Sequence, residues 1–108
     1  MAYAEAIQAL ADPTRRTVFE TLRGGPRSVG ELAAGLPVSR PAVSQHLRVL
    51  KRAGLVRDRR AGTRTFYSVD AGGLAELREY VEGFWDEALA AFREAAESEG
   101  GDDEVHDR

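Results

Sequence analysis

The stretch of sequence that decides the fold is "SRPAVSQHLRVLKRAGLV", Ser39–Val56. At about 100° per residue, its aliphatic side chains fall within one narrow sector of a helix. These are Val43, Leu47 and Leu50. Ser39 is a favourable N-cap, and Gly54 supplies the left-handed residue with which many helices end. The stretch therefore predicts a helix with one buried side and one polar side.

The polar side of this helix combines arginine, amide and hydroxyl groups. Its central row, at steps of i, i+4, i+7 and i+11, consists of Pro41, Gln45, Arg48 and Arg52, flanked by Arg40, Ser44 and Lys51. The major groove of DNA, about 12 Å wide, admits a helix and exposes the hydrogen-bonding edges of the bases. Gln45 can bond adenine through both amide atoms, and Arg48 can take guanine or a phosphate, whereas Ser44 suits either. Pro41 can touch a thymine methyl group. We expect Arg40, Lys51 and Arg52 to contact phosphates, which fix position rather than sequence. A plain solvated helix face is the alternative.

The segments before this helix predict three shorter helices. Ala4–Leu10 is compatible with a short helix. Asp12 followed by Pro13 predicts the start of a second, which carries Val18, Phe19 and Leu22 and ends at Gly24. Ser28 and Glu31 form a capping-box pattern that opens a third. The break at Gly35–Val38 spans about four residues, so the third helix and the one after Ser39 fit a helix-turn-helix.

The segments after this helix predict a hairpin and a long helix. Residues 55–60 and 63–69 alternate on either side of Ala61-Gly62, with Phe66 and Val69, or Tyr67 on the other face, as core. Helical periodicity then returns from Ala71 to about Glu97. Residues 98–108 are polar and acidic, and we expect them to be a disordered tail. The predicted fold is mainly α with a small β-hairpin, a winged helix-turn-helix in residues 1–97.

The net charge of −3 is the sum of a basic first part and an acidic second part of the sequence. Residues 1–69 carry 12 Arg and Lys against 5 Asp and Glu, whereas residues 70–108 carry 3 against 13. In Arg40–Arg64, 8 basic residues accompany a single acid, Asp58. This asymmetry favours a polyanion-binding surface in the first half.

The predicted hairpin places arginines at a thin tip, from which they can reach a minor groove or the neighbouring DNA backbone. The alternative is an edge ribbon made soluble by its charge. His46 lies at the edge of the buried sector, where a structural or phosphate-contacting role is more plausible than metal ligation. The candidate DNA-binding residues are Arg40, Pro41, Ser44, Gln45, His46, Arg48, Lys51, Arg52, Arg59, Arg60 and Arg64.

The last predicted helix has more apolar surface than a domain of this size needs. Part of its aromatic stripe is expected to be core, but exposed aromatic area favours self-association, most commonly as a two-fold dimer. We expect this helix and Ala4–Leu10 to form the interface, with Asp86 and Glu87 on its polar margin. The candidate dimer residues are Ile7, Leu10, Val81, Phe84, Trp85, Leu89 and Phe92.

The chain resembles the ArsR/SmtB family of bacterial winged-helix repressors. The resemblance is carried by "ALADPTRRTVFETL" (9–22), by the run from Ser28 to Val69 that includes "VSQHLRVLKRAGLV" and "FYSV", and by the aromatic last helix. It implies a homodimer that binds operator DNA and represses transcription until an effector releases it. It also implies that Ser44, Gln45 and Arg48 read bases and that Arg60 and Arg64 contact DNA from the hairpin.

The sequence departs from the metal-sensing members of that family. Those members carry a Cys-x-Cys pattern in the helix before the turn, or Asp/His ligands on the last helix. Here residues 30–35 read "GELAAG", and the last helix has no histidine. We therefore expect no metal and no cofactor, and a released state that depends on an unidentified small-molecule effector.

Several classes of protein are disfavoured by the same residues. The chain has no cysteine, so it cannot form a disulfide or a catalytic thiol. Its start does not fit a signal peptide, and no stretch approaches the roughly 20 apolar residues of a membrane span. We expect a cytoplasmic protein that is not an enzyme. Two alternatives remain: a winged-helix module for protein–protein interaction, and a metal-responsive repressor with unrecognised ligands.

Overall fold

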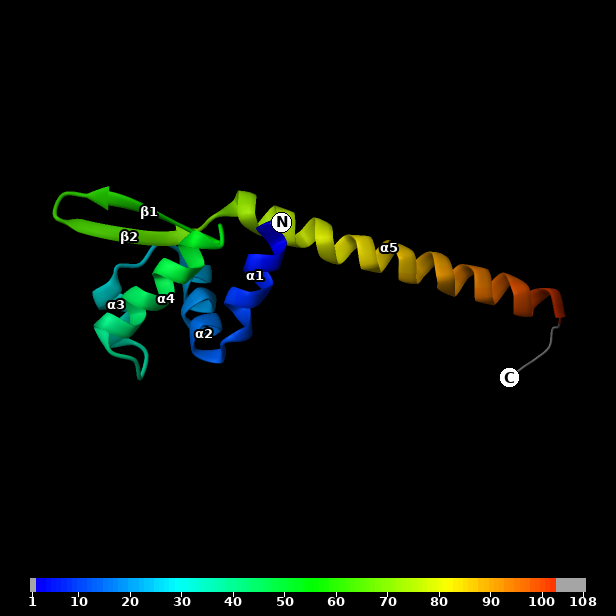
Figure 1. Ribbon diagram of the computed structural model, residues 1–108, viewed down its shortest axis with the longest axis horizontal. Helices are drawn as coiled ribbons and strands as arrows, with labels where there is room; N and C mark the ends of the chain where they lie inside the picture. The colour runs from blue at the N-terminus through cyan, green and yellow to red at the C-terminus, as the bar shows by residue number, and fades with distance from the viewer. Residues whose placement is uncertain (1, 103–108) are drawn as a thin grey trace. The chain divides into compact units, whose positions relative to one another are not determined.

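A computed structural model describes residues 2–102 of the chain, and the side chains of residues 3–98. Its elements follow one another in the predicted order (Figure 1). They are α1 (Ala2–Ala11), α2 (Pro13–Thr21), the 3-10 turn η1 (Leu22–Gly24), α3 (Val29–Ala34), α4 (Arg40–Arg52), β1 (Val56–Ala61), β2 (Arg64–Val69) and α5 (Ala71–Asp102). The chain divides into two compact units, residues 1–77 and residues 78–108. The fold is mainly α with one antiparallel hairpin, as predicted.

The helix starts are fixed by the capping residues that the sequence indicates. The side chain of Asp12 accepts from the Arg15 amide at 2.8 Å, directly before Pro13. Ser28 and Glu31 form a complete capping box, with each side chain accepting from the backbone N–H of the other. Ser39 Oγ accepts from the Ala42 amide at 3.3 Å. These bonds satisfy amide groups that have no acceptor within the helix.

The core of the first unit is built around α4, which packs against α2, α3 and β1. Three side chains of α4, those of Val43, Leu47 and Leu50, are at most 1% exposed. They meet buried aliphatic side chains from the other elements, namely Val18, Leu22, Leu32, Leu55 and Val56. Burial of these side chains orients α4, because each fully buried Val or Leu contributes about 1.5–3 kcal/mol. The predicted inward sector is confirmed.

The hairpin of β1 and β2 differs from the sequence prediction in two details. Ala61 pairs with Arg64, so the loop is Gly62-Thr63, one residue later than the predicted Ala61-Gly62. Gly62 has φ +66°, the positive value that a type II′ turn requires at its first loop residue. Tyr67 and Val69 pack against the core. Phe66 must then lie on the opposite face, because successive side chains of a strand alternate.

A third segment pairs with the hairpin. Arg27 exchanges two backbone hydrogen bonds with Tyr67 of β2, at 2.9 and 2.8 Å. This pairing covers part of the outer edge of β2. It also ties the hairpin to the loop just before α3, which positions the hairpin beside the helix-turn-helix.

The last helix, α5, is longer than the sequence indicates. It continues beyond the predicted end near Glu97 to Asp102. Gly100 and Gly101 lower helix propensity by about 1 kcal/mol each, but both keep the backbone donor that proline would remove. The helix can therefore pass through them. The remainder of the predicted tail, residues 103–108, lies outside the described residues. None of the described helices is both long and apolar enough to span a membrane.

Candidate nucleic-acid interface

The outward face of α4 is the polar row that the sequence indicates. Pro41, Gln45, Arg48 and Arg52 are all exposed, directly opposite the buried sector. On the flank, Arg40 and Lys51 are exposed and Ser44 is partly buried. The buried leucines therefore hold α4 with its amide and guanidinium groups facing out of the domain. This is the arrangement that a helix needs to enter a groove of DNA.

Two of these residues are joined to each other. The Arg48 guanidinium donates through Nη1 to Oε1 of Gln45, three residues earlier on the same face. The partner atom must be the amide oxygen, because a guanidinium has donors only. This pairing was not foreseen from the sequence, where the two residues were considered separately. The signal that could have revealed it is the i, i+3 spacing of the two residues on one helix.

Lys51 is joined to the hairpin. Its Nζ lies 3.0 Å from Oδ2 of Asp58, the single acid of the basic segment. Both side chains are partly exposed, so this pair contributes little to stability, of the order of 0–1 kcal/mol. Its effect is geometric: it connects the last turn of α4 to β1. Lys51 is thus already paired in the free protein.

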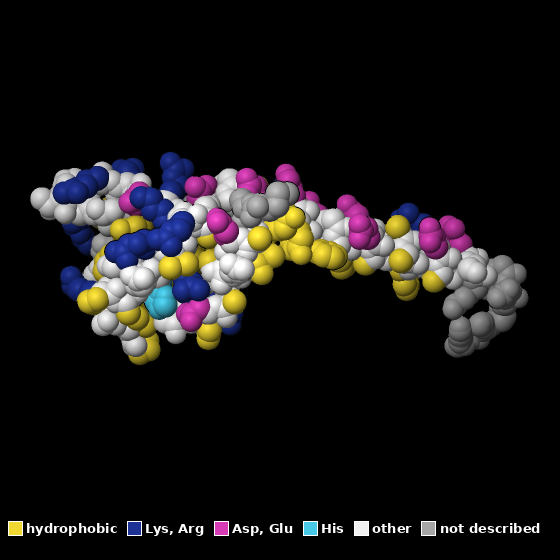
Figure 2. Space-filling model, viewed as in Figure 1, with side chains coloured by type: hydrophobic (Ala, Val, Ile, Leu, Met, Phe, Trp, Pro, Cys, Tyr) yellow, Lys and Arg dark blue, Asp and Glu magenta, His cyan; other side chains and the backbone are white. Residues whose placement is uncertain are grey.

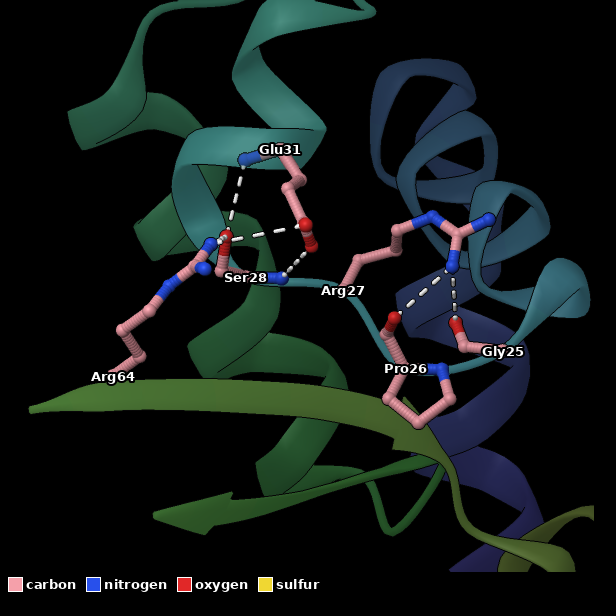
Figure 3. Close-up of polar contacts among 6 residues, drawn as sticks. All are labelled: Gly25, Pro26, Arg27, Ser28, Glu31 and Arg64. Carbon is pink, nitrogen blue, oxygen red and sulfur yellow. Dashed lines mark hydrogen bonds and ion pairs between the residues drawn. The ribbon is translucent and has the colours of Figure 1, made fainter. Parts of the chain in front are cut away.

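Arg64, the first residue of β2, contacts the start of α3 (Figure 3). Its Nη2 donates to Ser28 Oγ at 3.0 Å and lies 3.7 Å from Oε2 of Glu31. Its guanidinium carbon is 5.1 Å from the centre of the Phe66 ring. Figure 3 shows the Arg64 side chain reaching from β2 to the capping box. Sequence reasoning missed this contact, since the residues involved lie 36 positions apart.

The contacts around Glu31 also affect its protonation. The hydrogen bond from the Ser28 amide lowers the pKa of the Glu31 carboxyl, and the positive charges of Arg64 and Arg27 add to this effect. Glu31 therefore stays ionised to a lower pH than an ordinary glutamate. The pKa of Asp12 is lowered as well, chiefly by the hydrogen bond from the Arg15 amide.

A polar hollow of about 490 Å³ separates the hairpin from the two helices of the helix-turn-helix. Its walls come from Ser28, Val29, Gly30, Arg40, Thr63, Arg64, Thr65 and Tyr67. The Arg40 guanidinium lies over Gly30, where an added Cβ would come within 3.0 Å of its Nη2. Two arginines, Arg40 at the start of α4 and Arg64 of β2, thus line one hollow.

The remaining hairpin arginines are unpaired. Arg57, Arg59 and Arg60 are exposed, and none makes an ion pair within the described residues. Figure 2 shows Lys and Arg side chains gathered over the hairpin and the adjoining part of the domain. The predicted contact residues Arg59 and Arg60 are therefore available to a polyanion.

His46 lies apart from the exposed row. It is partly buried and lines a hollow of about 450 Å³ with residues of α2 and of the turn before α4. Its Nδ1 is buried and makes no hydrogen bond within the described part of the chain. This position favours a structural role for His46 over a phosphate-contacting one. In residues 2–102 no group of three or more His, Cys, Asp or Glu side chains is placed to hold a metal.

The candidate dimer residues are largely exposed in the single chain. On α5, Phe84, Trp85 and Phe92 are 60, 63 and 74% exposed, and Val81 and Leu89 are exposed as well. On α1, Ile7 is exposed, whereas Leu10 is partly buried and packs against the core. Trp85 is therefore exposed on the helix that carries it. Such a stripe of large apolar side chains is typical of an interaction surface.

Comparisons with known proteins agree with this arrangement. A family model described as a helix-turn-helix domain matches residues 10–59. The chain is 59% identical over 97 residues to the HTH-type transcriptional regulator Rv2034 of Mycobacterium tuberculosis, covering 90% of this chain and 91% of that one. It is also similar to the solution structure of a homodimeric winged helix-turn-helix DNA-binding domain from Mycobacterium bovis, described as a possible ArsR-family transcriptional regulator. That match has 33% identity, a TM-score of 0.65 and coverage of 82% of each chain.

The chain belongs to the ArsR/SmtB family. A further relative is the transcriptional repressor SdpR of Bacillus subtilis, 34% identical over 77 residues, which cover 71% of this chain and 86% of that one. Members of this family are DNA-binding transcriptional regulators rather than enzymes. The protein is accordingly a transcriptional regulator of ArsR/SmtB type with a DNA-binding helix-turn-helix.

Proposed function

We propose that this ArsR/SmtB regulator is a repressor that binds a palindromic operator as a homodimer. The observation that carries the proposal is the division of α4: its leucines and Val43 are buried, and its row from Pro41 to Arg52 is exposed. A helix held in this way can lie in a major groove while the rest of the domain stays outside it.

The residues of the interface divide into two kinds by their position. Ser44, Gln45 and Arg48 lie where they can reach base edges from the middle of α4, with Pro41 beside them. Arg40, Lys51 and Arg52 lie at the margins and contact phosphates. Arg59 and Arg60 contact the neighbouring backbone or minor groove from the hairpin. Arg64 contributes mainly by holding the hairpin in place through its hydrogen bond to Ser28. His46 contributes by its position against α2 and the turn before α4.

The dimer forms through the apolar stripe of α5, with Ile7 and Leu10 of α1 contributing. The exposure of three aromatic side chains on one helix supports this arrangement, as does the homodimeric state stated for the similar domain from Mycobacterium bovis. A two-fold pair of α4 helices about 34–36 Å apart would enter successive major grooves, which requires a palindromic operator.

Repression is supported by the similarity to SdpR, which is named a transcriptional repressor. Release would follow from a small-molecule effector, still unidentified, that binds the DNA-competent dimer less tightly than another state. A protein of this function acts where the chromosome is, in the cytoplasm.

Selection of bound duplexes from a random pool tests the proposal. The expected result is a palindromic sequence whose half-sites are one helical turn apart, bound with an affinity that falls steeply with salt. Recovery of no sequence preference, or of one asymmetric half-site by a monomer, would contradict it. A log–log salt slope of about −0.9 per neutralised phosphate gives the number of phosphate contacts.

A further inference from the structure

We infer that Gln45 and Arg48 act as one unit that reads guanine, and that Gln45 does not read adenine as it would by itself. The inference rests on the proposed operator binding and specifies which base the centre of α4 recognises. Its basis is the hydrogen bond that the Arg48 guanidinium donates to Gln45 Oε1 on the exposed face of α4.

The pairing changes what Gln45 can offer to a base. A free glutamine reads adenine with both ends of its amide: the oxygen accepts from adenine N6, and the amide hydrogens donate to N7. In this structure the oxygen already accepts from Arg48. A carbonyl oxygen has a second lone pair. An adenine amino group that used it would nevertheless place its hydrogens next to those of the guanidinium, with donors facing donors beside a positive charge.

The remaining groups of the pair are all donors. The amide hydrogens of Gln45 and the unused N–H groups of Arg48 point to no acceptor within the described residues. Guanine is the base with two neighbouring acceptors, N7 and O6, at its major-groove edge. A pair with only donors and a positive charge therefore matches guanine and is mismatched to the amino groups of adenine and cytosine.

The pairing also orders both side chains before DNA arrives. Long side chains lose up to about 2 kcal/mol of rotamer freedom when they are fixed. Part of this rotamer freedom is already lost in the free protein, because each residue restrains the other across one turn of α4. The two residues should consequently respond together, and not independently, when either is changed.

The first part of the test uses the wild-type protein and the operator recovered by selection. The position read by the pair is the one at which Gln45→Ala relaxes the base preference. We expect guanine there, with a loss of roughly 5- to 150-fold when adenine replaces it. Replacement by 7-deazaguanine, which lacks the N7 acceptor, should weaken binding. Replacement by inosine, whose major-groove edge equals that of guanine, should not.

The second part uses Arg48→Ala, with Arg52→Ala as the matched control. Removal of Arg48 frees the oxygen of Gln45, so the preference at this position should shift from guanine towards adenine. The Arg52 side chain lies exposed on the same row and makes no hydrogen bond or ion pair among the described side chains, so its removal should weaken binding to all four bases equally. Circular dichroism checks that each variant is folded, which is expected because both side chains lie outside the core.

The outcomes separate this inference from the proposed function. If no sequence is enriched, both fail. If an operator is found but the wild-type protein prefers adenine at the Gln45-dependent position, the pair does not read guanine, although the repressor proposal stands. The same conclusion follows if Gln45→Ala relaxes no position, or if Arg48→Ala leaves the preference unchanged.

Discussion

Glu31 connects the start of α3 to the hairpin through one carboxylate. Its Oε1 accepts from the Ser28 amide at 2.9 Å, which closes the capping box of α3. Its Oε2 lies 3.7 Å from the Arg64 guanidinium on the hairpin. The bond from the Ser28 amide is the main cause that lowers the pKa of Glu31, and the charge of Arg64 lowers it further. At the residue scale, the start of α3 and the position of the hairpin therefore depend on one ionised group.

The stability of the protein should depend on pH through this carboxylate. Its pKa is lower in the folded state than in the unfolded state, so its contribution is complete above the ordinary pKa of a glutamate. The contribution is lost as the pH falls from that value through the lowered pKa. Glu31→Gln, which keeps a capping-box acceptor, should flatten this acid-side loss, whereas Glu31→Ala should also destabilise the protein at neutral pH.

Urea unfolding from about pH 3 to about pH 7, a range that includes the ordinary carboxylate pKa values, measures this effect. Glu20→Gln serves as a control, because Glu20 is exposed and makes no ion pair within the described residues. An acid-side loss that is identical in the wild type and in Glu31→Gln would show that the carboxylate is not coupled to folding.

The sequence predicted residues whose role is local and missed those whose role depends on distant partners. Asp12, Ser28 and Ser39 cap helices through bonds to amides only three residues away, so a short pattern identifies them. The contact of Arg64 with Ser28 is created by the fold. The prediction that Gln45 can bond adenine depends on one side chain, whereas the hydrogen bond from Arg48 involves a second side chain on the same face.

At the scale of the elements, α5 begins in close contact with the end of α4. An added Cβ on Gly73 would lie 1.7 Å from the backbone oxygen of Gly54, far closer than any real contact. The Asp70 amide, just before α5, donates to the Leu55 oxygen at 2.8 Å. The first turn of α5 thus packs against the backbone that connects α4 to the hairpin, and only a glycine fits there.

Gly73→Ala should therefore destabilise the first unit, by about 1–3 kcal/mol as is typical of overpacking. Gly83→Ala provides the matched comparison, since its Cβ would meet no atom within 4 Å. In a helix interior this second change should stabilise by up to about 1 kcal/mol. Thermal or urea unfolding of the two variants measures both effects, and equal stabilities would contradict the close approach at Gly54.

The helices and strands were largely predictable, because helix caps, glycines and the spacing of apolar residues depend on residues that are close together in the sequence. The pairing of Arg27 with Tyr67 was not, since a single residue carries no strand pattern. The turn of the hairpin was placed one residue early, because Ala61 and Thr63 are equally acceptable beside Gly62 until the register of β1 and β2 is known.

At the scale of the whole molecule, the single chain leaves a large apolar surface unpaired. The predicted stripe on α5 is exposed, as a subunit interface must be in an isolated chain. Sequence periodicity identified the residues of this stripe but could not separate core from interface, because both produce the same spacing. The exposure of Trp85, at 63%, favours the second role.

Trp85→Glu should dissociate the dimer and reduce operator affinity, since it places a charge in the centre of an apolar interface. Ala90→Glu introduces the same charge on the opposite side of α5, where the residue is also exposed, and should leave the dimer intact. Size-exclusion chromatography with light scattering measures the mass of both variants. A wild-type mass in Trp85→Glu would place the subunit contact elsewhere.

The claim on which the account depends is that the exposed face of α4, together with the hairpin, is the surface that meets DNA. Titration of the isotope-labelled protein with its selected duplex, followed residue by residue by NMR, tests this claim most directly. We expect the largest changes at Gln45, Arg48 and Arg52 and at Arg59 and Arg60 of the hairpin, with one set of signals for both subunits. Unchanged signals along α4 in a complex that forms with high affinity would contradict the account.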